Sequence, residues 1–224
     1  MKLEIKYFFQ LLRKNNLERL ILFFFFLVIL TSKYIGYRSI APVLEFSPTI
    51  FANSLLAVKA PNVIANIIQN MSSIFLYSIG LFIPGSIFYF YLNNTHLLIY
   101  IRSHDYKIKG LFSFLFSITY SVIFIGLTHV ISHVIASSPI RINPYQVFIQ
   151  ILLLELLILL LNLFDTLGLL YLGYFIDLVL LLGLSNMMYK IVKISEVWQT
   201  VWLVLLIAGV HLFTLQLLYM KEIK

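Results

Sequence analysis

The chain has 224 residues, of which 61% are hydrophobic and only 11% charged, and its formal net charge at pH 7 is +7. A soluble domain carries roughly 25% charged residues, so this composition excludes an ordinary soluble domain and indicates an integral membrane protein. Cysteine is absent, which excludes a disulfide framework and a thiolate metal site. The basic excess is better explained by membrane orientation and anionic lipid than by nucleic acid.

Residues 1–18 are expected to lie in the membrane interface as an amphipathic helix. Apolar residues such as Leu3, Tyr7 and Leu11 recur at helical spacing among lysine and arginine residues, so one side can enter lipid while the other faces head groups. No small-residue cleavage site follows the first apolar run, which argues against a secretory signal. The alternative is that this stretch is the solvated start of a longer first helix.

Six apolar runs approach the ~20 residues needed to cross a hydrocarbon core about 30 Å thick. They cover residues 19–37, 71–92, 111–135, 146–163, 166–185 and 198–219. We therefore predict an all-α, polytopic membrane protein with about six transmembrane helices in a single domain, 1–224. The second run contains Pro84, which lacks a backbone donor and predicts a kink. The short connection NLFDT, residues 162–166, predicts a tight hairpin of the fourth and fifth spans.

Residues 38–70 mix polar residues and prolines with apolar stretches. The pair Ser47-Pro48 favours a helix start, and Pro61 favours a helix end or restart. We expect an outer segment with one or two short amphipathic helices. The alternative is a seventh span through 40–58.

The basic residues predict the orientation of the chain. With six spans and a cytosolic N-terminus, ten of the 16 lysine and arginine residues fall on the cytosolic side. These ten are Lys2, Lys6, Arg13, Lys14, Arg19, Arg102, Lys107, Lys109, Lys221 and Lys224. This agrees with the positive-inside rule, so we expect a multi-pass protein of the plasma membrane with both termini cytosolic. A seventh span would move the cluster at 102–109 outside and weaken the agreement.

The predicted cytosolic loop 93–110 contains the stretch LIYIRSHDYKIKG at 98–110. Asn93, Asn94 and Thr95 can cap a new helix, and apolar residues recur among the polar ones that follow. We expect a short helix across the cytosolic face. The alternative is a topology determinant that needs only to be basic.

The order of these elements resembles the permease subunits of type-2 ABC exporters, and more narrowly the small permeases beside bacteriocin and lantibiotic gene clusters. In those proteins the helix after span two is the coupling helix, which docks on a separate ATP-binding subunit. The matching residues are Tyr100, Ile101, Arg102, Ser103 and Lys107 to Gly110. Many relatives have a second basic residue and an aromatic residue in this motif, where this chain has His104, Asp105 and Tyr106.

The resemblance implies the role of this stretch and the partners of the chain. The ATPase-coupling residues would be Ile101, Arg102, Ser103, His104, Asp105, Tyr106 and Lys107. ATP would be bound and hydrolysed by the partner ATPase, so the chain itself would bind no cofactor and would not be an enzyme. A second copy or a homologous permease would complete the translocation path. The cargo would be a hydrophobic or amphipathic peptide, moved for export or for self-immunity.

The sequence shows no catalytic motif of its own. It has neither G-x-x-x-x-G-K-S/T nor H-E-x-x-H, so neither a P-loop ATPase nor a zinc protease of that kind is indicated. His129 and His133 share one helix face at spacing i, i+4, as a metal site or proton relay would need. No third ligand is nearby in sequence, and the alternative is a polar outer end of span three.

Two acids, Glu155 and Asp177, lie inside apolar runs. A charged carboxylate at mid-bilayer costs about 3 kcal/mol on insertion scales unless it is paired or protonated. Both are candidates for an interior face that handles a cationic cargo group or holds a partner subunit. The alternative is a structural role, with Glu155 protonated and hydrogen-bonded between helices. Other functional classes also remain open, namely a non-transporting assembly or sensor subunit and a membrane enzyme with an unfamiliar motif.

Overall fold

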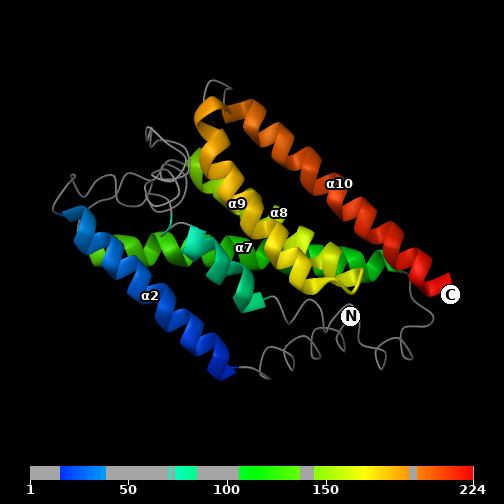
Figure 1. Cartoon of the computed structure of the whole chain (residues 1–224), viewed down its shortest axis with the longest axis horizontal. Helices are drawn as coiled ribbons and strands as arrows, with labels where there is room; N and C mark the ends of the chain where they lie inside the picture. The colour runs from blue at the N-terminus through cyan, green and yellow to red at the C-terminus, as the bar shows by residue number, and fades with distance from the viewer. Residues whose placement is uncertain are drawn as a thin grey trace.

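The computed structural model describes residues 16–38, 71, 74–84, 106–136, 144–191 and 196–223 (Figure 1). The described helices are α2 (Asn16–Arg38), Ile74–Pro84, α7 (Tyr106–Ala136), α8 (Pro144–Thr166), α9 (Leu170–Ile191) and α10 (Glu196–Ile223). No strand occurs in these residues. The all-α prediction is therefore confirmed for the part of the chain that the structure describes.

Three of these helices are long and apolar enough to cross a membrane, over Gly110–Val134, Val147–Thr166 and Thr200–Met220. Two shorter apolar helices cover Ile74–Pro84 and Leu170–Gly183. Lengths near 20 residues match the hydrocarbon core. The described helices thus support a helical membrane protein, while six spans remain a proposal.

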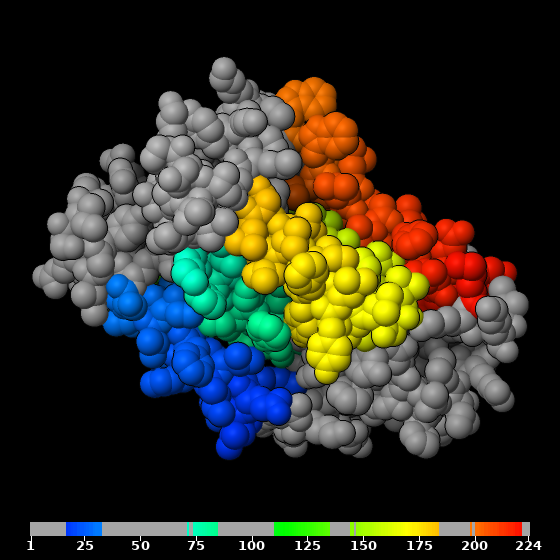
Figure 2. Space-filling view, in the orientation of Figure 1, coloured from blue at the N-terminus to red at the C-terminus, as the bar shows by residue number. Residues whose placement is uncertain are grey.

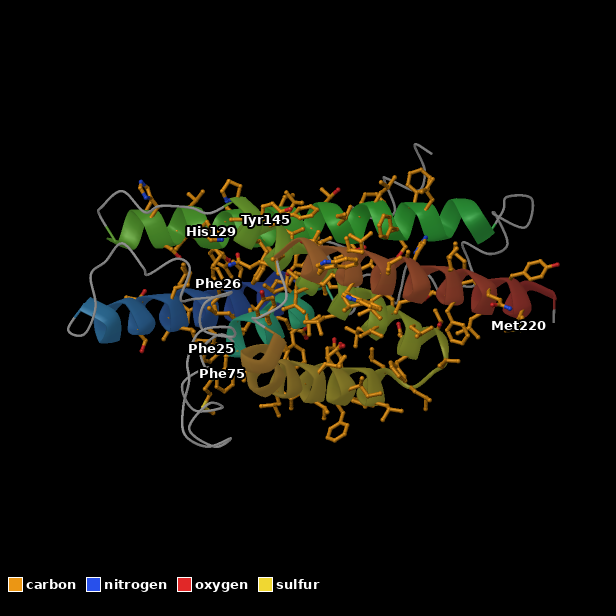
Figure 3. The ribbon with its side chains drawn as sticks, turned by 90° about the horizontal axis from the view of Figure 1, so that it is seen from above. Phe25, Phe26, Phe75, His129, Tyr145 and Met220 are labelled. Atoms are coloured by element: carbon orange, nitrogen blue, oxygen red, sulfur yellow. The ribbon has the colours of Figure 1, made fainter. Side chains whose placement is uncertain are left out.

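The helix α8 occupies the centre of the bundle. It packs against α7, α9 and α10, and 67% of its apolar span is buried, compared with 33% for α7 and 17% for α10. A helix that is hydrophobic all round is typically buried in this way. In Figure 3, α7 and α9 lie on opposite sides of the view. Figure 2 shows the yellow and gold patch of α9 at the surface, between α10 and the helix Ile74–Pro84.

A second packing centre joins α2, the helix Ile74–Pro84, α7 and α8. Phe26 of α2 lies 5.3 Å from the ring of Phe124 on α7, measured between centroids. The helix Ile74–Pro84 lies close to α7 and α8 at Gly80. A Cβ added there would lie 2.9 Å from the Phe124 ring and 3.3 Å from Leu154 of α8. The phenol of Tyr120 donates a hydrogen bond of 2.8 Å to the carbonyl of Gly80. This helix is therefore fixed to α7 by both packing and a hydrogen bond.

The hairpin of α8 and α9 has its turn a few residues later than predicted. Residues 162–166 belong to α8, and the turn is formed by 167–169. Gly168 adopts φ 79°, and its N–H donates to the carbonyl of Asp165 at 2.8 Å. The N–H of Leu169 donates to the carbonyl of Phe164 at 2.8 Å, which completes a Schellman cap. The predicted loop at 162–166 is wrong, because the polar residues there form the last turns of α8. The helix ends at the turn that contains Gly168.

Other predicted boundaries shift because the helices are longer than the apolar runs. The helix α7 begins at Tyr106, so the end of the predicted loop 93–110 is the first turn of the same helix as the third run. The helix α9 continues past the fifth run to Ile191, and α10 begins at Glu196, before the sixth run. Pro84 is the last described residue of its helix, so the predicted kink is not tested. Residues 1–15 of the interfacial helix and 39–70 of the outer segment lie outside the described residues.

Candidate functional site

Small hydroxyl residues form a buried face along α7. They are Ser113, Ser117, Ser121, Thr128 and Ser132. Most of the steps between them are four residues and the longest is seven, so they lie on one side of the helix. Thr128 and Ser132 donate to carbonyls one turn back in their own helix. Ser117 and Ser121 reach across to Glu155 of α8, so part of this face joins the two helices.

Glu155 of α8 is fully buried and accepts two hydrogen bonds from α7. The Oγ of Ser117 donates to Oε1 at 2.5 Å, and the Oγ of Ser121 donates to Oε2 at 3.1 Å. Each carboxyl oxygen therefore has one hydroxyl partner. This arrangement offsets part of the cost of placing a carboxyl inside an apolar bundle.

A second polar contact joins the same two helices toward the other end of α7. Nε2 of His129 lies 2.8 Å from Oε1 of Gln150 on α8. His129 is buried, whereas His133 is exposed on the same helix, so the two imidazoles do not share one environment. Among the described residues, no group of three or more His, Cys, Asp or Glu side chains could hold a metal ion. The predicted histidine pair is resolved here into one interhelical contact and one surface residue.

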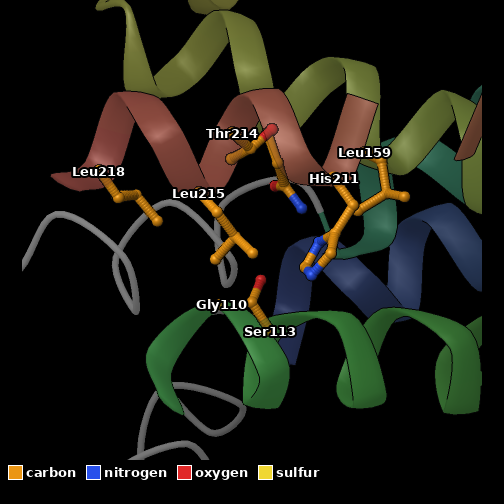
Figure 4. Close-up of a pocket in the computed structure, with 8 residues that line it drawn as sticks. Gly110, Ser113, Leu159, His211, Thr214, Leu215 and Leu218 are labelled. Carbon is orange, nitrogen blue, oxygen red and sulfur yellow. The ribbon is translucent and has the colours of Figure 1, made fainter. Parts of the chain in front are cut away.

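A small pocket lies where α7, α8 and α10 meet, and we call it the α10 pocket. Its volume is about 10 Å³. It is lined by Gly110, Ser113, Leu159, Asn162, His211, Thr214, Leu215 and Leu218. The His211 ring also packs on Phe114 of α7, with ring centroids 4.9 Å apart. Figure 4 shows the ring of His211 and the hydroxyl of Ser113 pointing toward each other across the pocket.

Asp177 of α9 lies apart from these contacts. It is fully buried, and neither carboxyl oxygen has a hydrogen-bond partner in the described part of the chain. Its neighbour Tyr174 stacks on Phe82 of the helix Ile74–Pro84, with centroids 4.8 Å apart. No hydrogen bond between described residues links Asp177 to Glu155. The two predicted acids are thus both buried, on different helices and with different partners.

The predicted ATPase-coupling residues fall mostly outside the described chain. Ile101, Arg102, Ser103, His104 and Asp105 lie in the segment that is not described. Tyr106 and Lys107 lie in the first turn of α7.

The sequence reasoning missed the hydroxyl face of α7 and the α10 pocket. The signal for the first was available, because Ser113, Ser117 and Ser121 are spaced four residues apart. The pocket combines Asn162 of α8 with His211 of α10. These residues are far apart in the sequence, and only the fold brings them together.

Comparisons of the chain with protein-family models, with curated proteins and with solved structures found no match.

Proposed function

We propose that the chain is the permease subunit of an ABC transporter in the plasma membrane, with both termini cytosolic. It would move a hydrophobic or amphipathic peptide, powered by a separate ATPase. The observation that best supports this is a polar contact inside an apolar bundle, in which Glu155 is held by two serines of α7. Ionisable residues within membrane helices commonly mark substrate or ion pathways.

The surface of the bundle fits the same proposal. The helix α10 exposes large apolar side chains along most of its length, including Trp198, Trp202 and Leu205. In a membrane such a surface contacts lipid or another membrane helix. A second permease copy, or a homologous permease, would pack on this type of surface and complete the path.

The cargo proposal is tested by neutral replacements of the two buried acids. Glu155→Gln and Asp177→Asn preserve the shape of each side chain but remove its ability to ionise. We expect both variants to assemble normally and to reduce peptide export or peptide resistance. Unchanged transport by both variants at equal protein level would assign the acids a structural role.

The ATPase proposal is tested on the predicted coupling residues. Arginine presents a planar fork of five donors that lysine cannot copy, and removal of a buried aromatic anchor often costs more than about 2 kcal/mol of binding. Arg102→Lys and Tyr106→Ala are therefore expected to leave membrane insertion normal but to weaken co-purification of the ATPase. Matched controls are Arg141→Lys and Tyr171→Ala, the second at a side chain that is 89% exposed. Full ATPase binding and transport in the Arg102→Lys, Tyr106→Ala double variant would contradict the coupling role and would leave residues 98–110 as a topology determinant that needs only to be basic.

A further inference from the structure

The α10 pocket contains a buried donor that no group in the described part of the chain satisfies. Nδ2 of Asn162 has no hydrogen-bond partner among the described residues, although the side chain is only 4% exposed. A buried donor without an acceptor is unfavourable, so the pocket suits a ligand that presents an acceptor. A volume of about 10 Å³ limits that ligand to about one water molecule.

The other polar groups of the pocket can complete the hydrogen bonds of such a water. Thr214 donates its own proton to the carbonyl of Val210 at 2.9 Å, which leaves its oxygen as an acceptor. Ser113 and His211 also line the pocket. A buried water typically makes about three hydrogen bonds, and groups on α7, α8 and α10 provide them.

The pocket is aligned with Glu155 along both helices. On α7, Ser113 precedes Ser117 by one turn, about 6 Å of helix, and Ser117 donates to Glu155. On α8, Asn162 follows Glu155 by about two turns, about 10 Å. Two buried hydroxyl residues, Ser113 at the pocket and Ser117 at the carboxyl, therefore follow one another along the same face of α7.

We propose that the α10 pocket binds water and that this water delivers protons to Glu155 through Ser113 and Ser117. A hydronium ion at the Gly110 end of α7 gives up a proton and becomes water, Ser113 and Ser117 each take up one proton as they pass on their own, and Oε1 of Glu155 receives the proton of Ser117. The carboxylate then becomes a neutral carboxyl, and the reverse transfer returns the proton to water. One helical turn is longer than a hydrogen bond, and Ser117 does not line the α10 pocket, so a second water between Ser113 and Ser117 completes the path.

The groups around Glu155 are consistent with proton exchange at this residue. The titratable residues with described side chains on the helices packed against α8 are Tyr120, His129 and His133 on α7, Tyr171, Tyr174 and Asp177 on α9, and His211 and Tyr219 on α10. Among the side chains described on these helices, none is lysine or arginine. This inference goes beyond the proposed transport function and depends on neither an ATPase nor a peptide.

The test is infrared spectroscopy of the full chain in lipid, with deuterated water as the probe. The carbonyl band of protonated Glu155 is identified by its loss in Glu155→Gln, and deuterium exchange shifts it. We expect rapid exchange in the wild type and exchange at least tenfold slower in Asn162→Leu, which removes the hydrogen-bonding groups at nearly constant volume. Ser113→Ala provides a second, smaller change with the same expected direction.

Two controls separate this effect from general loosening or tightening of the bundle. Thr119→Ala changes an exposed hydroxyl of the same helix that bonds only to its own backbone, and it should leave the exchange rate unchanged. The Asp177 carboxyl, identified by its loss in Asp177→Asn, should exchange at the same rate with and without Asn162→Leu. The inference is overturned if Glu155 shows no protonated band at any pH, or if its exchange rate is the same in both pocket variants as in the wild type.

Discussion

Removing the two serines that hold Glu155 should destabilise the bundle by a predictable amount. Hydrogen bonds between membrane helices average about 0.6 kcal/mol and reach about 1.7 kcal/mol. Ser117→Ala removes the contact of 2.5 Å and Ser121→Ala the contact of 3.1 Å, so the first change should cost more. The double variant leaves a fully buried carboxyl without its two hydroxyl donors, and we expect a loss of about 1–3 kcal/mol.

The assay is reversible unfolding in mixed micelles, followed by the loss of helical circular dichroism. Thr119→Ala is the matched control, since its hydroxyl is exposed and donates only to Leu115 of the same helix. Adding Glu155→Leu to the double variant should restore most of the stability, because removing both partners of a buried hydrogen bond can be nearly neutral. If the double variant is as stable as Thr119→Ala, the Glu155 contact does not hold α7 to α8.

Three further outcomes are expected. Gly80→Ala should cost about 1–3 kcal/mol by overpacking against Phe124, whereas Gly126→Ala, with nothing within 4 Å of the added Cβ, should not destabilise the fold in the same unfolding assay. Gly168→Ala should cost about 1 kcal/mol, because φ of 79° is strained for residues with a Cβ; wild-type stability would contradict this. A reporter that is active only outside the cell, fused at Lys224, should be inactive, and activity would refute the six-span topology.

The helical membrane class could be predicted because apolar runs near 20 residues match the thickness of a bilayer and are typical of membrane-spanning helices. The end of α8 could not be placed from hydropathy, since Asn162 and Asp165 look like loop residues. In the structure both are buried in the last turns of the helix. The hydroxyl of Thr166 donates a hydrogen bond of 2.7 Å to the carbonyl of Leu163. Gly168 was the better signal for the turn, because glycine readily adopts the left-handed conformation found there.

The polar contacts of the site could be predicted only in part. Glu155 stood out because a carboxyl in an apolar run is rare, but its partners did not, since serine and threonine hydroxyls often bond to their own helix. Ser117 does both, with bonds to Phe114 at 2.9 Å and to Glu155, whereas the hydroxyl of Thr119 bonds only to Leu115. Whether a hydroxyl of α7 also bonds to α8 depends on whether its residue faces α8, and tertiary packing decides which residues do.

ATP-dependent peptide movement in inside-out membrane vesicles tests the central claim most directly. Vesicles would carry the chain together with the ATPase that co-purifies with it, and a fluorescent hydrophobic peptide would report transport. The proposed function predicts that the amount of peptide in the vesicles changes only when ATP, an intact ATPase and the chain are all present. It also predicts that Glu155→Gln reduces the rate of this peptide movement. Peptide movement that is unchanged when the chain is deleted would contradict it.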